Sequence, residues 1–263
     1  MIKEKIISYA NKIKQNQFLF EELVKRDFKR RYARTTLGMA WSILNPLLQL
    51  LVMRLVFTHF FGRGTPHYTT FLFSGMVIFN YFSESTNEGM TSIVDNSAIF
   101  TKINVPKYLF LFAKSIQSTI NFLLILVVFF IFCLFDHVTF TWKFLLLLYP
   151  IILIVFFNIG TSLVLSAIYV FFRDMRYFWS VFLMLLQYVS AIFYQIDTFS
   201  DSIQKVFYIN PVYLYIRYFR KIVIEAEIPS LAFHVLMLAE AIFIFITGIL
   251  VYRKYNLKFL YYL

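Results

Sequence analysis

The chain alternates between long apolar runs and short polar segments, and this alternation predicts its helices. A helix needs about 20 residues, at about 1.5 Å each, to cross about 30 Å of hydrocarbon. Five apolar runs reach that length, and a sixth, from Thr69 to Phe82, reaches it only if its polar end continues as helix. The six predicted spans are residues 39–61, 69–89, 108–134, 142–171, 178–196 and 230–252. We therefore expect an all-α polytopic membrane protein in which Pro150 kinks the fourth span or marks its first turn.

The segment before the first span, residues 1–38, carries an amphipathic pattern. Apolar residues at Phe20, Leu23, Phe28 and Tyr32 recur at helical spacing among lysines and arginines. This pattern predicts a helix that lies in the inner membrane interface and is attracted to anionic lipid. A solvated run of charges that only sets the topology is the alternative interpretation.

The segment between the fifth and sixth spans, residues 197–229, is too polar to cross the membrane and too apolar for an ordinary loop. Asn210–Pro211 divides it, because proline favours a break in the preceding helix. We expect two short re-entrant or interfacial helices that dip into the outer leaflet.

Composition and charge fit this membrane topology. The chain is 60% hydrophobic and 15% charged, against about 45–50% and about 25% in soluble domains. Its net charge of +11 would suggest nucleic-acid binding in a soluble domain. With six spans and both ends inside, however, most of the 25 lysines and arginines fall into cytosolic segments, including the tail 253–263. The positive-inside rule accounts for the charge, and no nucleic-acid partner is expected.

Several kinds of chemistry are excluded by the residues themselves. The single cysteine, Cys133, cannot form an internal disulfide, and the four histidines are scattered without metal-ligand spacing. No metal site and no bound cofactor are therefore expected. Neither G-x-x-x-x-G-K-[ST] nor G-x-G-x-x-G occurs, so this chain does not hydrolyse ATP through a P-loop.

Ionisable residues inside the predicted spans are candidates for function, because charge in hydrocarbon is costly. Arg54 lies in the first span, Lys114 in the third and Glu240 near the middle of the sixth. We expect Lys114 to extend its amine toward the membrane surface. For Arg54 and Glu240 the hypothesis is a buried ion pair or a contact with the permeation path, and a packed, protonated Glu240 is the alternative.

Two spans also carry polar stripes at helical spacing. The positions are Trp41, Asn45 and Gln49 in the first span, and Ser180, Gln187 and Tyr194 in the fifth. Facing stripes of this kind line an aqueous or sugar-compatible path, or else form hydrogen bonds between packed helices. Trp41, Tyr188 and Tyr194 lie beside polar neighbours, and aromatic faces suit the C–H surfaces of sugar rings. We therefore assign these seven residues to a channel lining.

Four segments in order then resemble one family. RDFKRRYARTTLGMAWSILNPLLQL resembles the opening signature of ABC-2 type permeases that export bacterial polysaccharides. SAIFTKINVPKYLFLFAKS is similar to the family's cytoplasmic turn between spans two and three, and FRDMRYFWSV to its turn between spans four and five. INPVYLYIRYFRKIVI is similar to its outer segment before the last span. The resemblance covers essentially the whole chain.

The resemblance implies a particular assembly and cargo. A homodimer of six-span subunits would pair with two copies of a separate P-loop ATPase, which uses ATP and Mg²⁺. The complex would lie in the bacterial inner membrane with both termini of this chain in the cytosol. Its cargo would be a polysaccharide such as O-antigen, linked to an undecaprenyl-pyrophosphate type lipid, as in lipopolysaccharide biosynthesis.

The resemblance also implies roles for individual residues. The ATPase would dock on the amphipathic N-terminal helix and on the coupling turn, residues 90–107, where the docking residues would be Asn96, Phe100, Lys102 and Pro106. Those that meet the lipid pyrophosphate at the entrance would be Arg30, Arg31 and Arg34. The outer gate would include Asn210, Pro211, Tyr215 and Phe219.

Three other classes remain as alternatives. An ABC-2 permease for a drug or small lipid would share the topology. An integral membrane glycosyltransferase or acyltransferase would need an accessible acid cluster, and the one acid pair near a surface is Glu84 and Glu88, four residues apart. A solvated or lysine-paired end of the second span is the favoured interpretation of that pair. An ion-coupled carrier would need several buried acids and internal repeats.

Overall fold

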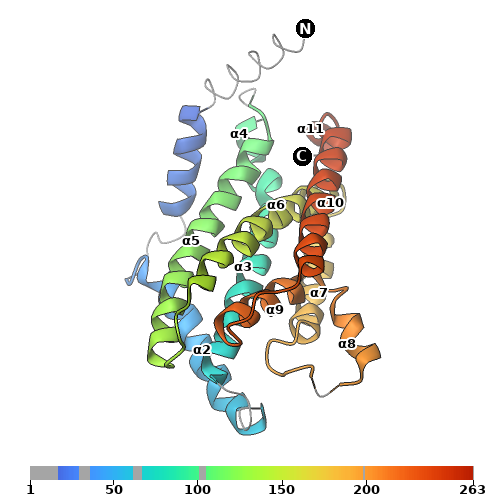
Figure 1. Ribbon diagram of the computed structural model, residues 1–263. Coiled ribbons are helices and arrows are strands. Elements are labelled where there is room, and N and C mark those ends of the chain that lie inside the picture. Colours follow the sequence, from blue (N-terminus) through green and yellow to red (C-terminus); the bar gives the residue numbers. More distant parts are fainter. Residues whose placement is uncertain (1–16, 30–35, 62–66, 101–104, 198, 263) are drawn as a thin grey trace.

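The computed structural model describes residues 17–29, 36–61, 67–100, 105–197 and 199–262, and within these ranges the regular structure is helical (Figure 1). Its five longest helices are α2 (Ala40–Phe61), α3 (Tyr68–Asp95), α5 (Tyr108–Phe135), α6 (Leu148–Phe171) and α10 (Leu231–Tyr255). Shorter elements are α4 (Ser97–Phe100), η1 (Trp142–Leu147), α7 (Met175–Val189), α8 (Asp201–Phe207), α9 (Pro211–Val223) and α11 (Phe259–Tyr262).

In the described part of the chain, four segments are long and apolar enough to cross a membrane. They are Ala40–Thr58, Tyr108–Phe135, Trp142–Phe171 and Leu231–Tyr255. α3, the second predicted span, is one uninterrupted helix of 28 residues, and acidic residues in its second half reduce its hydropathy. Pro150 is the third residue of α6, where its missing N–H leaves no helix hydrogen bond unmade. The protein is therefore a polytopic helical membrane protein.

The fifth predicted span, 178–196, matches the structure only in part. α7 ends at Val189 and has 15 residues, which extend over roughly 22 Å and so fall short of the hydrocarbon thickness. After it the chain turns, with Ala191 in the left-handed region at φ 51°. Side chains from α9 and its N-cap donate hydrogen bonds to backbone carbonyls that would accept helix N–H groups if α7 were longer. Asn210 donates to the carbonyl of Val189, and Arg220 donates to that of Ala191.

α9 is packed inside the protein rather than on the outer leaflet. Asn210 caps it by accepting the backbone N–H groups of Val212 and Tyr213, and Pro211 occupies its first position. The helix is buried on nearly all sides, not only on the apolar face that the sequence predicts. It lies against α3 and η1, so its tyrosines form part of the core. α8, by contrast, is largely exposed.

α6 and α10 pack closely against each other, and glycine makes their approach possible. A Cβ atom built on Gly160 would lie 2.7 Å from the carbonyl carbon and oxygen of Ile244, and one on Gly248 would lie 3.0 Å from Cα of Gly160. Small residues at such crossings let two backbones touch, which is a common way to join helices in lipid.

One end of the bundle carries the helical residues 17–29 together with α4 and α11, and we call it the terminal end (Figure 1). Leu23 belongs to a buried apolar cluster there, with Phe110 of α5, Tyr252 of α10 and Phe259 of α11. The apolar face of residues 17–29 thus contributes to a protein core, and Tyr32 of the predicted face lies outside the described residues.

Candidate functional site: a polar seam between two helices

Polar side chains follow the line along which α3 and α5 pack together. Those of α3 are Asn80, Glu84, Glu88, Thr91 and Asp95, and those of α5 are Lys114, Gln117 and Asn121. Spacings of three and four residues place each set on one helix face. We call this set the polar seam. It begins at the terminal end and reaches the middle of both helices, and a cavity opens at each of these two positions.

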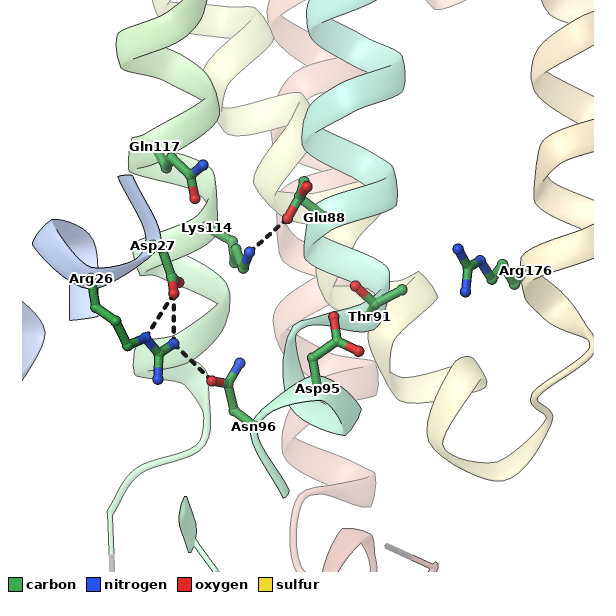
Figure 2. Close-up of a pocket in the computed structure, with 9 residues that line it drawn as sticks. All are labelled: Arg26, Asp27, Glu88, Thr91, Asp95, Asn96, Lys114, Gln117 and Arg176. Atoms are coloured by element: carbon green, nitrogen blue, oxygen red, sulfur yellow. Dashed lines mark hydrogen bonds and ion pairs between the residues drawn. The ribbon is translucent and has the colours of Figure 1, made fainter. Parts of the chain in front are cut away.

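The first cavity, of about 540 Å³, lies at the terminal end, where residues 17–29 cover the seam (Figure 2). The Nζ of Lys114 donates 2.7 Å to Glu88, so the lysine-paired interpretation of Glu88 is confirmed. Arg176, from the start of α7, lines the cavity from the opposite side. Gln117 is buried here, and its side-chain carbonyl oxygen has no protein partner among the described residues.

Arg26 ties the amphipathic helix to the corner between α3 and α4. Its Nη2 donates to Oδ1 of Asn96 at 2.8 Å and to Oδ1 of Asp27 at 2.6 Å (Figure 2). Asn96 in turn donates 2.8 Å to the carbonyl of Ser92 in the last turn of α3. The Asp27 side chain is 2% exposed, so Arg26 supplies the countercharge that this buried carboxylate requires.

The remaining coupling residues lie near this corner or outside the described ranges. Phe100 is the last residue of α4, and the carbonyl of Pro106 accepts the N–H of Leu109 as α5 begins. Lys107 donates 3.1 Å to the carbonyl of Asn256, and its partial burial lowers the pKa of the amine. Four predicted basic residues fall outside the described residues: Arg30, Arg31, Arg34 and Lys102.

The second cavity, of about 520 Å³, lies at the other end of the seam, near the middle of α3 and α5, where α2 joins them. All three predicted channel residues of α2 line it, which are Trp41, Asn45 and Gln49. They do not meet the predicted stripe of the fifth span there. Instead they meet Asn80 and Glu84 of α3 and Asn121 of α5.

The other predicted channel residues lie in different places. Ser180 lines a small cavity beside Arg176, and Gln187 is half-buried on α7. Tyr188 is 59% exposed, and its carbonyl accepts the hydroxyl of Tyr194 at 2.8 Å. Tyr194 itself follows α7 and lines a cavity that is also lined by residues of α9. Within one chain, the two stripes therefore do not border a common path.

The two predicted buried charges also lie apart. α2, which carries Arg54, packs on α3 and α5, whereas α10, which carries Glu240, packs on α6 and α9. No ion pair joins Arg54 and Glu240 in the part of the chain that the structure describes, in line with the different packing partners of their helices. Arg54 is exposed on α2, and Glu240 is half-buried.

The predicted outer gate includes a buried arginine that sequence reasoning missed. Tyr215 and Phe219 are each 1% exposed and therefore belong to the core of the protein. Arg220 is 3% exposed and donates to the carbonyls of Ala191 and Ile192, at 2.8 and 2.9 Å. No pattern in the sequence distinguishes it from Arg217 and Lys221, the basic residues on either side of it in α9, which are only partly buried.

Comparison with known proteins identifies the family. The model of the ABC-2 type transporter family matches residues 19–224. The O-antigen export system permease protein RfbA of Myxococcus xanthus is 31% identical over 119 residues, 45% of this chain and 46% of that protein. RfbA of Klebsiella pneumoniae is 28% identical over 160 residues, 57% of this chain and 60% of that protein.

A third relative is the polysialic acid transport protein KpsM of Escherichia coli, 27% identical over 154 residues, 54% of this chain and 60% of that protein. The aligned segments thus span about half to three fifths of the relatives' own lengths. The family match extends from the amphipathic helix through α9 and so includes the whole polar seam. This chain is a member of the ABC-2 type transporter family of membrane proteins.

Proposed function

We propose that this chain is the membrane subunit of an ATP-driven exporter that moves a lipid-linked polysaccharide, such as O-antigen, out of the bacterial cytosol. The names of the relatives above support a polysaccharide cargo. In this proposal two copies of the chain form the channel in the inner membrane, and two copies of a separate P-loop ATPase bind at the terminal end. Both termini then face the cytosol.

The bond between Arg26 and Asn96 is the observation that carries this proposal. It joins the amphipathic helix to the turn at α4, the two elements expected to dock the ATPase. A partner that pushes on either element therefore also moves the last turns of α3, where the polar seam begins. Expression of the chain with a candidate ATPase from a neighbouring gene tests the proposal. The two should co-purify, and ATP should drive export of a glycan; transport or glycan modification by the chain alone, without nucleotide, would refute it.

Replacing Arg26 by methionine should uncouple the two elements. The change removes the bond to Asn96 and leaves the buried Asp27 without its cation, which costs about 1–3 kcal/mol. We expect weaker ATPase binding and a several-fold drop in ATP-dependent export. Lys25→Met is the matched control, because Lys25 is adjacent and pairs with Glu22 on the exposed face. Equal export by the two variants would contradict the coupling role.

A second copy is needed because one chain does not close a path between α2 and α7. α7 is poorly covered, and its strongly exposed side chains are Tyr177, Phe178, Val181, Met184, Leu185 and Tyr188. If this exposed side of α7 faced lipid, Ser180 and Gln187 on the same helix would have no aqueous path beside them. In the proposed dimer, α7 of one copy faces the other copy across the channel.

Cross-linking in native membranes with a flexible bismaleimide tests this arrangement, because such a reagent can bridge a channel that is too wide for a disulfide. In a Cys133→Ser background, Tyr188→Cys should give a dimer, since two copies of α7 would face each other. Ile152→Cys is the control, because it is also exposed, at 54%, but lies on α6. If the two variants cross-link equally, collision in the membrane explains the dimer and α7 is not at the interface.

A further inference from the structure

A third cavity, of about 430 Å³, opens between the ends of α6 and α10 and the start of α11, at the terminal end of the bundle. Its described lining is apolar or aromatic apart from Lys258, and its largest rings are those of Phe171, Phe172, Tyr255 and Tyr262. Phe171 is the last residue of α6, and Tyr255 is the last residue of α10. Two membrane-spanning helices therefore end at this cavity, at the depth where lipid headgroups lie and where aromatic residues gather.

The aromatic rings form one wall of the cavity and carry two hydroxyl groups. The ring of Phe171 packs edge-on against those of Tyr255 and Tyr262, with centroids 5.5 and 4.8 Å apart. Neither tyrosine hydroxyl forms a hydrogen bond within the described part of the chain. A wall of this kind offers an apolar surface to an acyl chain, and its hydroxyls can donate hydrogen bonds to a headgroup.

Three cations surround the mouth of the cavity. Lys258 lines it, and its ammonium group has no partner among the described residues. Arg173 donates to the carbonyl of Tyr262 at 3.5 Å, a bond too long to satisfy the guanidinium. The Nζ of Lys254 lies 5.5 Å from the ring centroid of Tyr255. All three basic side chains are exposed, so they can turn toward one ligand.

The described lining of the cavity contains no acidic residue that would offset this charge. Residues 164–176 and 248–262 supply both the lining and the three cations, and their one acid, Asp174, is exposed and does not line the cavity. The mouth is therefore positively charged. A free phosphate would use only the mouth, and a neutral lipid would use only the apolar wall. An anionic phospholipid matches both parts, because basic pockets between helix ends bind such headgroups.

We propose that this cavity binds one anionic phospholipid, such as phosphatidylglycerol, from the cytosolic leaflet. One acyl chain lies against Phe171 and Tyr255, and the phosphate accepts hydrogen bonds from Lys258 and Arg173. Because Arg173 follows α6 and Lys258 follows α10, one headgroup bridges the ends of the two helices. The site goes beyond the proposed function, since this lipid belongs to the membrane and is not the cargo.

Native mass spectrometry of the purified full-length chain in mild detergent tests the site. The probes are phosphatidylglycerol and phosphatidylethanolamine with the same acyl chains. Phosphatidylglycerol should bind tightly as one copy per chain, and phosphatidylethanolamine, which has no net charge, should bind only weakly. Glycerol 3-phosphate, which has no acyl chain, should not displace the bound lipid. Lys258→Met should weaken phosphatidylglycerol binding about fivefold, as expected for one basic residue beside an anionic headgroup.

Arg253→Met is the matched control, because it removes the same charge near the end of α10 from a residue that does not line the cavity. Ile168→Trp changes no charge but fills the cavity from α6, and should also lower phosphatidylglycerol binding. It keeps the test decisive if Lys258→Met does not fold.

Three results would overturn the lipid site: equal binding of the two lipids to wild type, equal losses in Lys258→Met and Arg253→Met, or unchanged binding by Ile168→Trp. If Lys258→Met binds lipid like wild type but loses the ATPase, this face docks the ATPase instead, and the lipid site is also wrong. The proposed function is tested separately, because ATP-dependent glycan export by the wild-type complex does not depend on which lipid the cavity selects.

Discussion

Replacing Arg220 by methionine is expected to unfold the turn after α7 and to abolish export. The guanidinium holds three backbone carbonyls, those of Ala191, Ile192 and Phe71, at 2.8, 2.9 and 3.2 Å. It also lies 3.4 Å over the ring of Phe71. Methionine fills much of the same volume but donates no hydrogen bond. Each buried carbonyl left without a partner costs about 1–3 kcal/mol.

One opposing term reduces this effect without reversing it. Removing a buried guanidinium also removes the cost of keeping a charge out of water, which in some proteins makes such replacements neutral. Here, however, two of the three acceptors, the carbonyls of Ala191 and Ile192, belong to a non-helical turn, and Ala191 already adopts a positive φ. The third, the carbonyl of Phe71 in α3, also accepts the hydroxyl of Ser74 and so keeps a partner. We therefore expect a net loss of about 3 kcal/mol or more, seen as a lower midpoint of thermal unfolding and faster hydrogen exchange at residues 190–196.

Lys221→Met is the control for Arg220→Met, since it removes the same charge one position along α9. Lys221 lies only 3.7 Å from Glu227 in a partly exposed pair, so its loss should change stability little. Arg220→Lys should behave like the methionine variant, because one ammonium group cannot span three carbonyls as the planar guanidinium does. A stable, fully active Arg220→Met protein would show that the turn holds itself without this side chain.

Replacing Gly248 by leucine is expected to separate α6 from α10 and to prevent stable assembly. A Cβ at this position meets the backbone of Gly160, and backbone atoms of two packed helices cannot move aside as a flexible side chain can. Overpacking ordinarily costs about 1–3 kcal/mol, and a contact with backbone belongs at or above the upper end of that range. The measurement is the amount of protein that remains monodisperse in mild detergent and its unfolding midpoint.

Ala239→Leu is the matched control for the glycine variant. Ala239 is exposed on the same helix, so the added side chain should meet lipid or detergent rather than backbone. If both leucine variants lose the same stability, added bulk alone explains the effect. The close crossing of α6 and α10 would then not be the cause of the lost stability.

The features that could be predicted from the sequence are those that depend on local pattern. Pro150 marks the first turn of α6, and Asn210–Pro211 starts α9, because capping and the missing N–H of proline act within one turn of helix. The continuity of α3 also followed from its pattern, since Glu84 and Glu88 lie at helical spacing beyond the apolar run.

The features that could not be predicted depend on contacts between distant residues. The end of α7 at Val189 is fixed by side chains of Asn210 and Arg220, which the local hydropathy of residues 178–196 does not reveal. The partners of the α2 stripe were unforeseen for the same reason. Spacing places Gln49 on a helix face, but only tertiary packing decides that this face meets Asn80 of α3. One available signal was overlooked: Asn80 lies four residues before Glu84 and extends the same polar face.

The contact between Arg220 and Phe71 has a consequence for the order in which the protein is made. The two residues are separated by 149 positions, so Phe71 leaves the ribosome long before its guanidinium partner exists. At about 5–20 residues per second this interval is roughly 7–30 s. During that time α3, α5 and α6 enter the membrane without the helix that later fills the space among them. The α9 end of the bundle therefore closes only late in biogenesis, and until then it is open to lipid and to quality-control proteases.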